Sequence, residues 1–447
     1  MENETINQEN PTVNPDSKPR FPVDEKVIAV LMIGVAYLYV FGLIRGLDIE
    51  YKSTYLTTFR VCFAIFGTAY LAFAMVLYRK VKFTFESGIW MACVLITLVR
   101  VVSPVRLGSL FGLKENVWED IWAFFFLHAF AIYFTLARSD RLAEHKSSHF
   151  LPFDAVDGTF IIPFKRIYLQ VQAIIHIFSD RSHDAKDGKK KGHAVLWALV
   201  ALVVAVIFFI IALNLLAKAD DNFEKMVQGF LDLFEIEWGE YITYFILSIP
   251  VGLYVFGMLA GMRHETRAHI EGRSGGLMKF VTALGKVPAV VWACLLFGFS
   301  AVYMVFFGLQ GQYLFGAFLG KLPEGFTYSS YARQGFFELL QIMVINFALL
   351  WFSGRTSNQK EKRSVVLFVA QIVLLAASML FAAISFAKLF MYIDVFGFTP
   401  LRIKSSWLVV VLFLGCICTL VHLVSGKKTV RPWIIFSGAT LALMCLL

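Results

Sequence analysis

Residues 364–388 read SVVLFVAQIVLLAASMLFAAISFAK and contain no charged side chain before Lys388. A run of this kind is long enough to cross the roughly 30 Å hydrocarbon core of a bilayer as a helix. Similar apolar runs recur along the whole chain, and we predict an all-α, polytopic transmembrane bundle of about 11 spanning helices. The predicted spans are 27–44, 58–78, 85–102, 117–136, 194–217, 241–261, 287–310, 335–353, 364–388, 406–424 and 432–447.

The composition supports a membrane protein without a large soluble domain. The chain has 447 residues, of which 58% are hydrophobic and 16% are charged, whereas a soluble domain carries about 25% charged residues. The net charge of +9 does not indicate nucleic-acid binding, because the basic residues lie at the ends of the apolar runs. Contact with anionic lipid headgroups explains that placement.

The distribution of Lys and Arg predicts the orientation of the chain. Most basic residues fall in the N-terminal tail and in alternate loops, including the run Lys189–Lys191. The positive-inside rule therefore predicts a cytoplasmic N-terminus and an outside C-terminus. Along the chain we predict a disordered tail at 1–26, a four-helix membrane region at 27–136, a basic cytoplasmic loop at 137–193 and a seven-helix membrane region at 194–447.

Two loops contain amphipathic patterns. Apolar residues from Phe164 to Phe178 recur at helical spacing in the cytoplasmic loop, which predicts a helix in the headgroup layer. A helix packed beneath the bundle is the alternative. A second stripe, Phe223 to Phe234, has an acidic opposite face that starts at Asp220. We interpret that face as solvated, with a cation or a basic partner as the alternative.

Motifs of soluble enzymes are absent from the sequence. There is no phosphate-binding Gly-Lys-Ser/Thr loop, dinucleotide fingerprint or nucleophile elbow. Cys416 and Cys418 lie two residues apart on a predicted helix, with His422 as the one nearby metal-binding residue type. Residues at this spacing point to different faces of a helix, so we expect no metal and no cofactor.

Two polar stretches interrupt the apolar pattern. Residues 322–351 contain Tyr331, Arg333 and Glu338, and residues 385–402 contain Lys388 and Arg402. The predicted topology places both stretches on the outer side. Charged groups at the edge of a bundle are costly unless they are paired or reach water, so these stretches indicate either a polar pocket or internal ion pairs.

The same stretches resemble a known family. The run Tyr331-Ala-Arg-Gln-Gly-Phe-Phe-Glu-Leu339 and the run from Met391-Tyr392 through Gly397-Phe-Thr-Pro-Leu-Arg402 are similar to signatures of a bacterial family of multi-spanning membrane proteins of unknown function. The resemblance covers about residues 320–405 and implies a multi-pass protein of the bacterial plasma membrane. It implies no activity or catalytic residue. Lys388-Leu-Phe stands where the family pattern has an Arg-Met pair, so no arginine role is carried over there.

Together these features predict an outward-facing ligand site without catalytic residues. Its candidate residues are Arg333, Glu338, Tyr331, Asp394, Arg402, Lys388 and Arg100. The leading hypothesis is transport or handling of a small or anionic ligand, such as a lipid headgroup, gripped by arginines. A signalling or assembly partner that binds a cytoplasmic protein through 137–193 is the second hypothesis. The third is a membrane-embedded enzyme on lipid-linked substrates, with Glu338 or Asp394 as acid or base.

Overall fold

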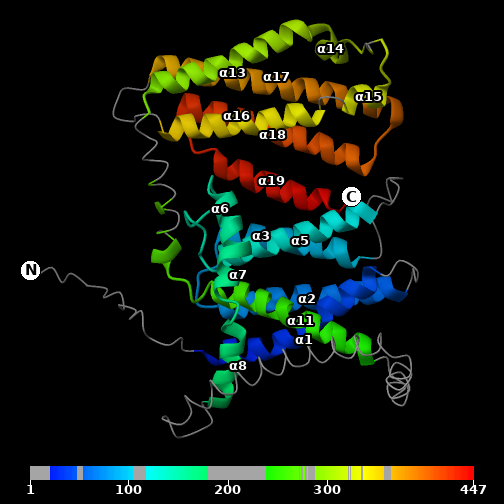
Figure 1. Ribbon diagram of the computed structural model, residues 1–447, viewed down its shortest axis with the longest axis vertical. Helices are drawn as coiled ribbons and strands as arrows, with labels where there is room; N and C mark the ends of the chain where they lie inside the picture. The colour runs from blue at the N-terminus through cyan, green and yellow to red at the C-terminus, as the bar shows by residue number, and fades with distance from the viewer. Residues whose placement is uncertain are drawn as a thin grey trace, which may run out of the picture. The chain divides into compact units, whose positions relative to one another are not determined.

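Every regular element of the described chain is a helix, which confirms the all-α prediction. The computed structural model (Figure 1) describes residues 21–47, 54–103, 117–179, 238–270, 287–320, 324–333, 336–356 and 364–446, with a few single residues between 272 and 322. Within these residues, nine helices are long and apolar enough to cross a membrane. The protein is therefore a multi-pass membrane protein.

Nine of the predicted spans are present as these long helices. The predicted span 432–447 is present as a helix of only 15 residues, and the helix that contains the predicted span 364–388 continues to Phe396. The bounds of these helices are α1 Val23–Leu47, α2 Thr54–Leu77, α3 Phe85–Val102, α5 Val117–Arg138, α11 Trp238–Gly261, α13 Ala289–Leu309, α16 Phe336–Thr356, α17 Val365–Phe396, α18 Pro400–Ser425 and α19 Val430–Met444. The predicted span 194–217, the run Lys189–Lys191 and the acidic helix near 220–235 lie outside the described residues.

Polar caps set the ends of several spans. Thr84 precedes α3 and its hydroxyl accepts the backbone N–H of Ser87 at 3.2 Å. Ser364 caps α17 in the same way. Thr399 caps α18, with Pro400 at the first helical position, where its missing N–H leaves no bond unmade. These caps satisfy backbone groups that would otherwise be unpaired at the membrane edge.

Contacts divide the chain into two compact units. One unit comprises 1–40 and 163–264, and the other comprises 41–162 and 265–447. Each unit is described on its own below. The predicted four-helix and seven-helix regions describe the order of spans along the chain, and they remain predictions.

In the first unit, a short helix crosses α11. The predicted helix 164–178 is present as α7 Ile162–Lys165 and α8 Leu169–Ser179. A Cβ added at Gly257 on α11 would lie 2.9 Å from the Pro163 carbonyl oxygen, so only glycine allows this close crossing. Leu169 and Ala173 are buried, whereas Tyr168 is exposed. The helix thus buries one side and leaves the other side open.

In the second unit, α3 packs on both α5 and α19. Gly438 of α19 faces the ring of Trp90 on α3. Two short elements, α6 Leu151–Val156 and the π-helix η1 Asp157–Ile161, run against α5. Gly158 of η1 faces Leu136 there, so part of the loop after α5 is built into the helix bundle.

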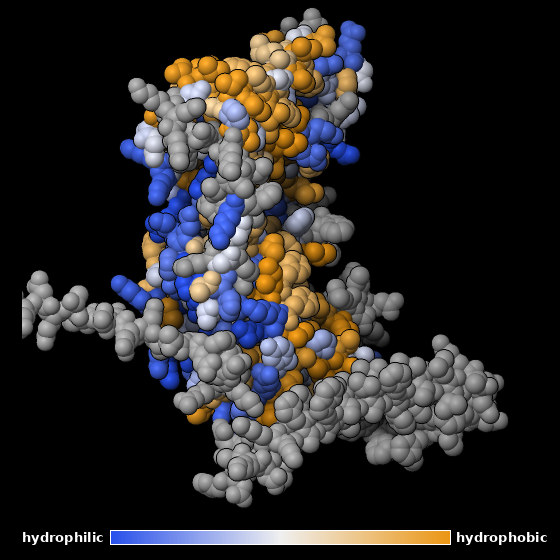
Figure 2. Space-filling model, turned by 60° about the vertical axis from the view of Figure 1, so that its left-hand side comes forward, coloured by the Kyte–Doolittle hydropathy of each residue, from blue (hydrophilic) through white to orange (hydrophobic). Residues whose placement is uncertain are grey.

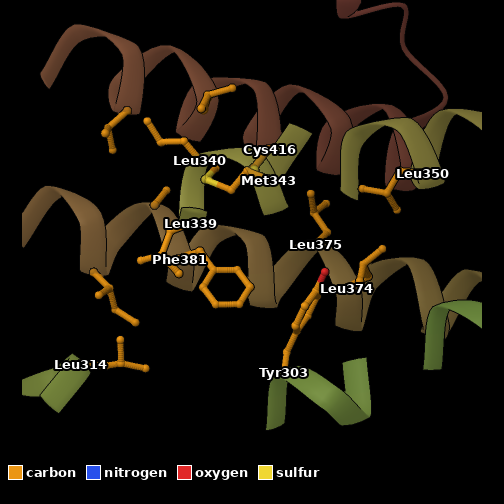
Figure 3. Packing of buried hydrophobic residues seen from close by; sticks show 14 of the residues in the cluster. Tyr303, Leu314, Leu339, Leu340, Met343, Leu350, Leu374, Leu375, Phe381 and Cys416 are labelled. Atoms are coloured by element: carbon orange, nitrogen blue, oxygen red, sulfur yellow. The ribbon is translucent and has the colours of Figure 1, made fainter. Parts of the chain in front are cut away.

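The rest of this unit is an apolar core between α13, α16, α17 and α18. Figure 3 shows Phe381 of α17 surrounded by residues of that core, including Tyr303 and Leu339. Polar pairs also lie within it: the Tyr303 hydroxyl donates to Asn346 Oδ1 at 2.7 Å, and Asn346 Nδ2 donates to Ser378 Oγ at 2.9 Å. The outer surface of α13 is also apolar, in the upper part of Figure 2, as expected of a helix that faces lipid.

Candidate functional site

The predicted polar stretches meet at one end of the second unit. Between α13 and α16 the chain forms three short elements, α14 Gly311–Phe315, the 3₁₀-helix η2 Gly316–Leu319 and α15 Tyr328–Arg333. α15 and η2 both pack against α17, and Figure 1 shows α14 and α15 at the end where α17 turns into α18. This arrangement brings 313–333 and 388–402 together.

Lys388 is the central buried charge at this end. It is 1% exposed, and its Nζ lies 4.1 Å from the ring centroid of Tyr313 and 4.5 Å from that of Tyr331. The Tyr331 hydroxyl donates to the Tyr313 carbonyl oxygen, which fixes the two rings relative to each other. An ammonium group within 6 Å of an aromatic face is stabilised by the ring quadrupole. The two tyrosines therefore offset part of the desolvation of Lys388.

Arg402 occupies the turn between α17 and α18. Its guanidinium carbon lies 4.1 Å from the ring centroid of Tyr392, and its Nη1 donates to the carbonyl oxygens of Phe396 at 2.9 Å and Gly397 at 2.6 Å. Gly397 ends α17 with a φ of +73°, a conformation that favours glycine. The turn geometry thus sets the position of the arginine.

Arg333 approaches the same tyrosine from α15. It is exposed and lines an open hollow of about 580 Å³ together with Thr327, Ser329, Ser330 and Phe337. Ser329 Oγ donates to the Tyr392 hydroxyl at 3.4 Å. Arg333 and Arg402 both interact electrostatically with that hydroxyl. Arg333 and three hydroxyl side chains therefore line one surface hollow, and the bond from Ser329 connects them to Tyr392 and its neighbour Arg402.

The two predicted acidic residues lie on the outside of this end. Asp394 is exposed near the end of α17, and Glu338 is exposed on α16. Burial raises the pKa of Tyr313, and the charge of Glu338 raises it further, so Glu338 lies within electrostatic reach of the tyrosine pair. Among the described residues, neither Arg333 nor Arg402 forms an ion pair with a carboxylate.

Arg100 belongs to a different helix of the same unit. It is on α3 and 5% exposed, and its charge acts on Lys404 and Cys445. The structure therefore brings together Tyr331 and Lys388 and places Arg333 and Arg402 around Tyr392. Arg100 acts on Lys404, two positions after Arg402 on α18. Tyr313 was missed by the sequence analysis, since it precedes the polar stretch and looks like any aromatic residue of an apolar segment.

A second polar cluster lies at the opposite end of this unit. Glu86, at the start of α3, is 3% exposed; its Oε1 accepts from Arg431 Nε at 2.6 Å and its Oε2 accepts from Ser147 Oγ at 2.7 Å. The indole N–H of Trp90 donates to the same Ser147 oxygen at 3.1 Å. Across the part of the chain described, no group of three or more His, Cys, Asp or Glu is placed to hold a metal ion.

Comparison with known proteins gives a family and no activity. No curated protein and no solved structure is similar enough to this chain to count as a match. A family model for a domain of unknown function, DUF4153, matches residues 101–447. The matched region is well over half of the chain and contains both polar stretches. The chain therefore belongs to the DUF4153 family of domains of unknown function.

Proposed function

We propose that the protein binds a small anion or an anionic lipid headgroup at the end formed by α15, α17 and α18, as a step in its transport or handling. The observation that carries the proposal is the pair Arg333 and Arg402. Both guanidinium groups interact with Tyr392, and Arg333 also lines the hollow. No carboxylate pairs with either arginine among the described residues. Unneutralised arginines at a bundle edge favour an external anion.

The chemistry of the hollow fits an oxyanion. Guanidinium groups bind phosphate and carboxylate through two parallel N–H donors. The hydroxyls of Thr327, Ser329 and Ser330 also line the hollow. Each donates its proton within the protein, to Ser330, Tyr392 and the Thr327 carbonyl oxygen respectively, so a bound anion would receive a hydroxyl donor only by replacing one of these bonds. The positive-inside rule would place this end outside the cell, so the ligand would arrive from the outer side.

The buried amine gives the site a second layer. Lys388 lies beneath the surface on the tyrosine pair, and a positive charge held in low dielectric attracts an anion more strongly than one in water. In the proposed function, Arg333 and Arg402 capture the anion and Lys388 attracts it inward.

Binding measurements with defined probes test the proposal. The full-length protein in detergent would be titrated with inorganic phosphate, and the same protein would be exposed to vesicles with and without phosphatidylglycerol. We expect Arg333→Ala and Arg402→Ala each to weaken binding at least tenfold, which is about 1.4 kcal/mol. Arg79→Ala, an exposed arginine at the opposite end, is the matched control and should bind like the wild type.

The two probes separate the sources of the anion. Arginine-dependent binding of phosphate alone supports a free solute, and arginine-dependent binding of phosphatidylglycerol vesicles alone supports a headgroup. Wild-type protein that binds neither probe, or binding that survives both arginine substitutions, would refute the proposal.

A further inference from the structure

At the end of the second unit opposite to the proposed anion site lies a buried carboxyl group, one oxygen of which has no hydrogen-bond partner among the described residues. Asp154, on α6, is 4% exposed. Its Oδ1 accepts the backbone N–H of Ala143 at 2.9 Å. Its Oδ2 is also buried and has no hydrogen-bond partner among the described residues. An ionised carboxylate buried with an unpaired oxygen is strongly disfavoured, whereas a neutral carboxyl carries a proton on that oxygen.

The charged groups that face Asp154 come from several elements. Asp157 of η1 and Glu144 of the preceding loop are both acidic, and Arg267, in the chain segment after α11, is the one cation that acts on Asp154. Arg267 donates to the carbonyl oxygens of Leu142 at 2.8 Å and Ala143 at 2.9 Å. Two like charges and a single cation engaged with the backbone leave the carboxylate form poorly neutralised.

Tyr133 of α5 completes the surroundings. Its hydroxyl is buried and lies near Ser147, but not in hydrogen-bonding geometry with it. The hydroxyl interacts electrostatically with Asp154 and with Glu86, and Glu86 is itself bonded to Arg431 of α19. Tyr133 is therefore a further polar group within electrostatic reach of the Asp154 carboxyl.

We propose that Asp154 is a proton-binding site, in which one proton from solvent bonds to Oδ2 and the neutral carboxyl holds α6 against α5. Release of that proton leaves a buried carboxylate and weakens the packing of α6 and η1. The proposal is independent of anion binding at the other end of the unit.

The electrostatic balance agrees with this geometry. Burial raises the pKa of Asp154 to about 7, and Asp157 and Glu144 also raise it, whereas the Ala143 N–H and Arg267 lower it. An aspartate in the unfolded chain titrates near its ordinary value of 3.8. The folded protein therefore holds a proton that the unfolded chain has lost. The contribution of this bound proton to the free energy of unfolding is fully present below about pH 4 and is lost as the pH rises through about 7.

Equilibrium unfolding of the full-length protein in mixed detergent–SDS micelles, from about pH 5 to about pH 8.5, measures this linkage. As the pH rises toward about 7, loss of the Asp154 proton should increase the unfolding constant of the wild type by up to tenfold per pH unit, and this increase should stop above about pH 7. Asp154→Asn, which mimics the neutral carboxyl, should lack this increase of the unfolding constant with pH. Asp157→Asn is the matched control on the next turn. In this variant the unfolding constant should still increase with pH, but the increase should stop at a lower pH, because one like charge near Asp154 has been removed.

Infrared spectroscopy provides a second measurement if Asp154→Asn does not fold. The C=O band of a neutral carboxylic acid should disappear in the wild type as the pH rises through 7, and Asp157→Asn should shift that midpoint to lower pH. Identical pH dependence of unfolding in Asp154→Asn and the wild type, or the absence of such an infrared band, would overturn the proposal.

Discussion

The packing of α19 on α3 predicts a large effect for Gly438→Ala. A Cβ at this position would lie 2.7 Å from both Cη2 and Cζ3 of Trp90. That ring is 3% exposed, is bonded to Ser147, and stacks edge-on against Tyr133 at 4.5 Å. Because the ring has no room to move, one of these contacts must break. Overpacking of this kind costs about 1–3 kcal/mol, and the better helix propensity of alanine returns about 0.5–1 kcal/mol. At the middle of these two ranges, the net loss of stability is about 1 kcal/mol.

Gly298→Ala is the matched control. Gly298 also lies inside a helix, α13, but a Cβ there would meet nothing within 4 Å. The same substitution should therefore stabilise the protein by about 0.5–1 kcal/mol through propensity alone. The two alanine variants are expected to move in opposite directions.

Thermal unfolding in detergent, followed with a thiol-reactive dye, can measure both variants. Cys93, Cys416 and Cys445 are buried and free, so they react when the bundle opens. For a chain of this length, each kcal/mol shifts the midpoint by about 1 °C. A midpoint for Gly438→Ala equal to or above that of the wild type would refute the close contact of α3 and α19.

Two further substitutions test buried polar groups, both by the same unfolding measurement. Glu86→Gln removes the charge that pairs with Arg431 and should destabilise the protein by about 1–2 kcal/mol. The loss is modest because the Arg431 side chain is 42% exposed and can bind water instead. An unchanged midpoint would mean that the ion pair contributes nothing to stability. Asn346→Leu leaves the buried Tyr303 hydroxyl without its acceptor and removes the donor to Ser378, which should destabilise the protein by about 1–3 kcal/mol. A variant as stable as the wild type would contradict these hydrogen bonds.

Nine of the spans could be predicted from the sequence because each is a continuous apolar run at least as long as a bilayer requires. The pairing of helices could not. Glu86 and Arg431 are 345 positions apart, and each looked like an ordinary charge at the end of a span. Nor does hydropathy mark Gly438 as the glycine that meets Trp90, since many glycines in the chain face open space.

The candidate site shows the same division. Tyr331, Lys388 and Arg402 could be found as polar residues out of place in an apolar pattern. Tyr313 could not, because its role depends on the turn that brings α14 back over α17. Arg100 fitted the predicted depth equally well, but depth along the membrane normal does not specify which neighbouring helix a side chain meets.

The length of α17 determines what Lys388 encounters. The helix has 32 residues, or about 48 Å at 1.5 Å per residue, whereas about 20 residues suffice for the acyl-chain region. If the first turn of α17 lies at one boundary of the acyl-chain region, its last three turns lie beyond the opposite boundary. Lys388 and Tyr392 then lie beyond the acyl-chain region, in the part of α17 that α15 and η2 cover. A dissolved ion could reach the exposed Arg333 beside them by diffusion through water, without entering the acyl-chain region.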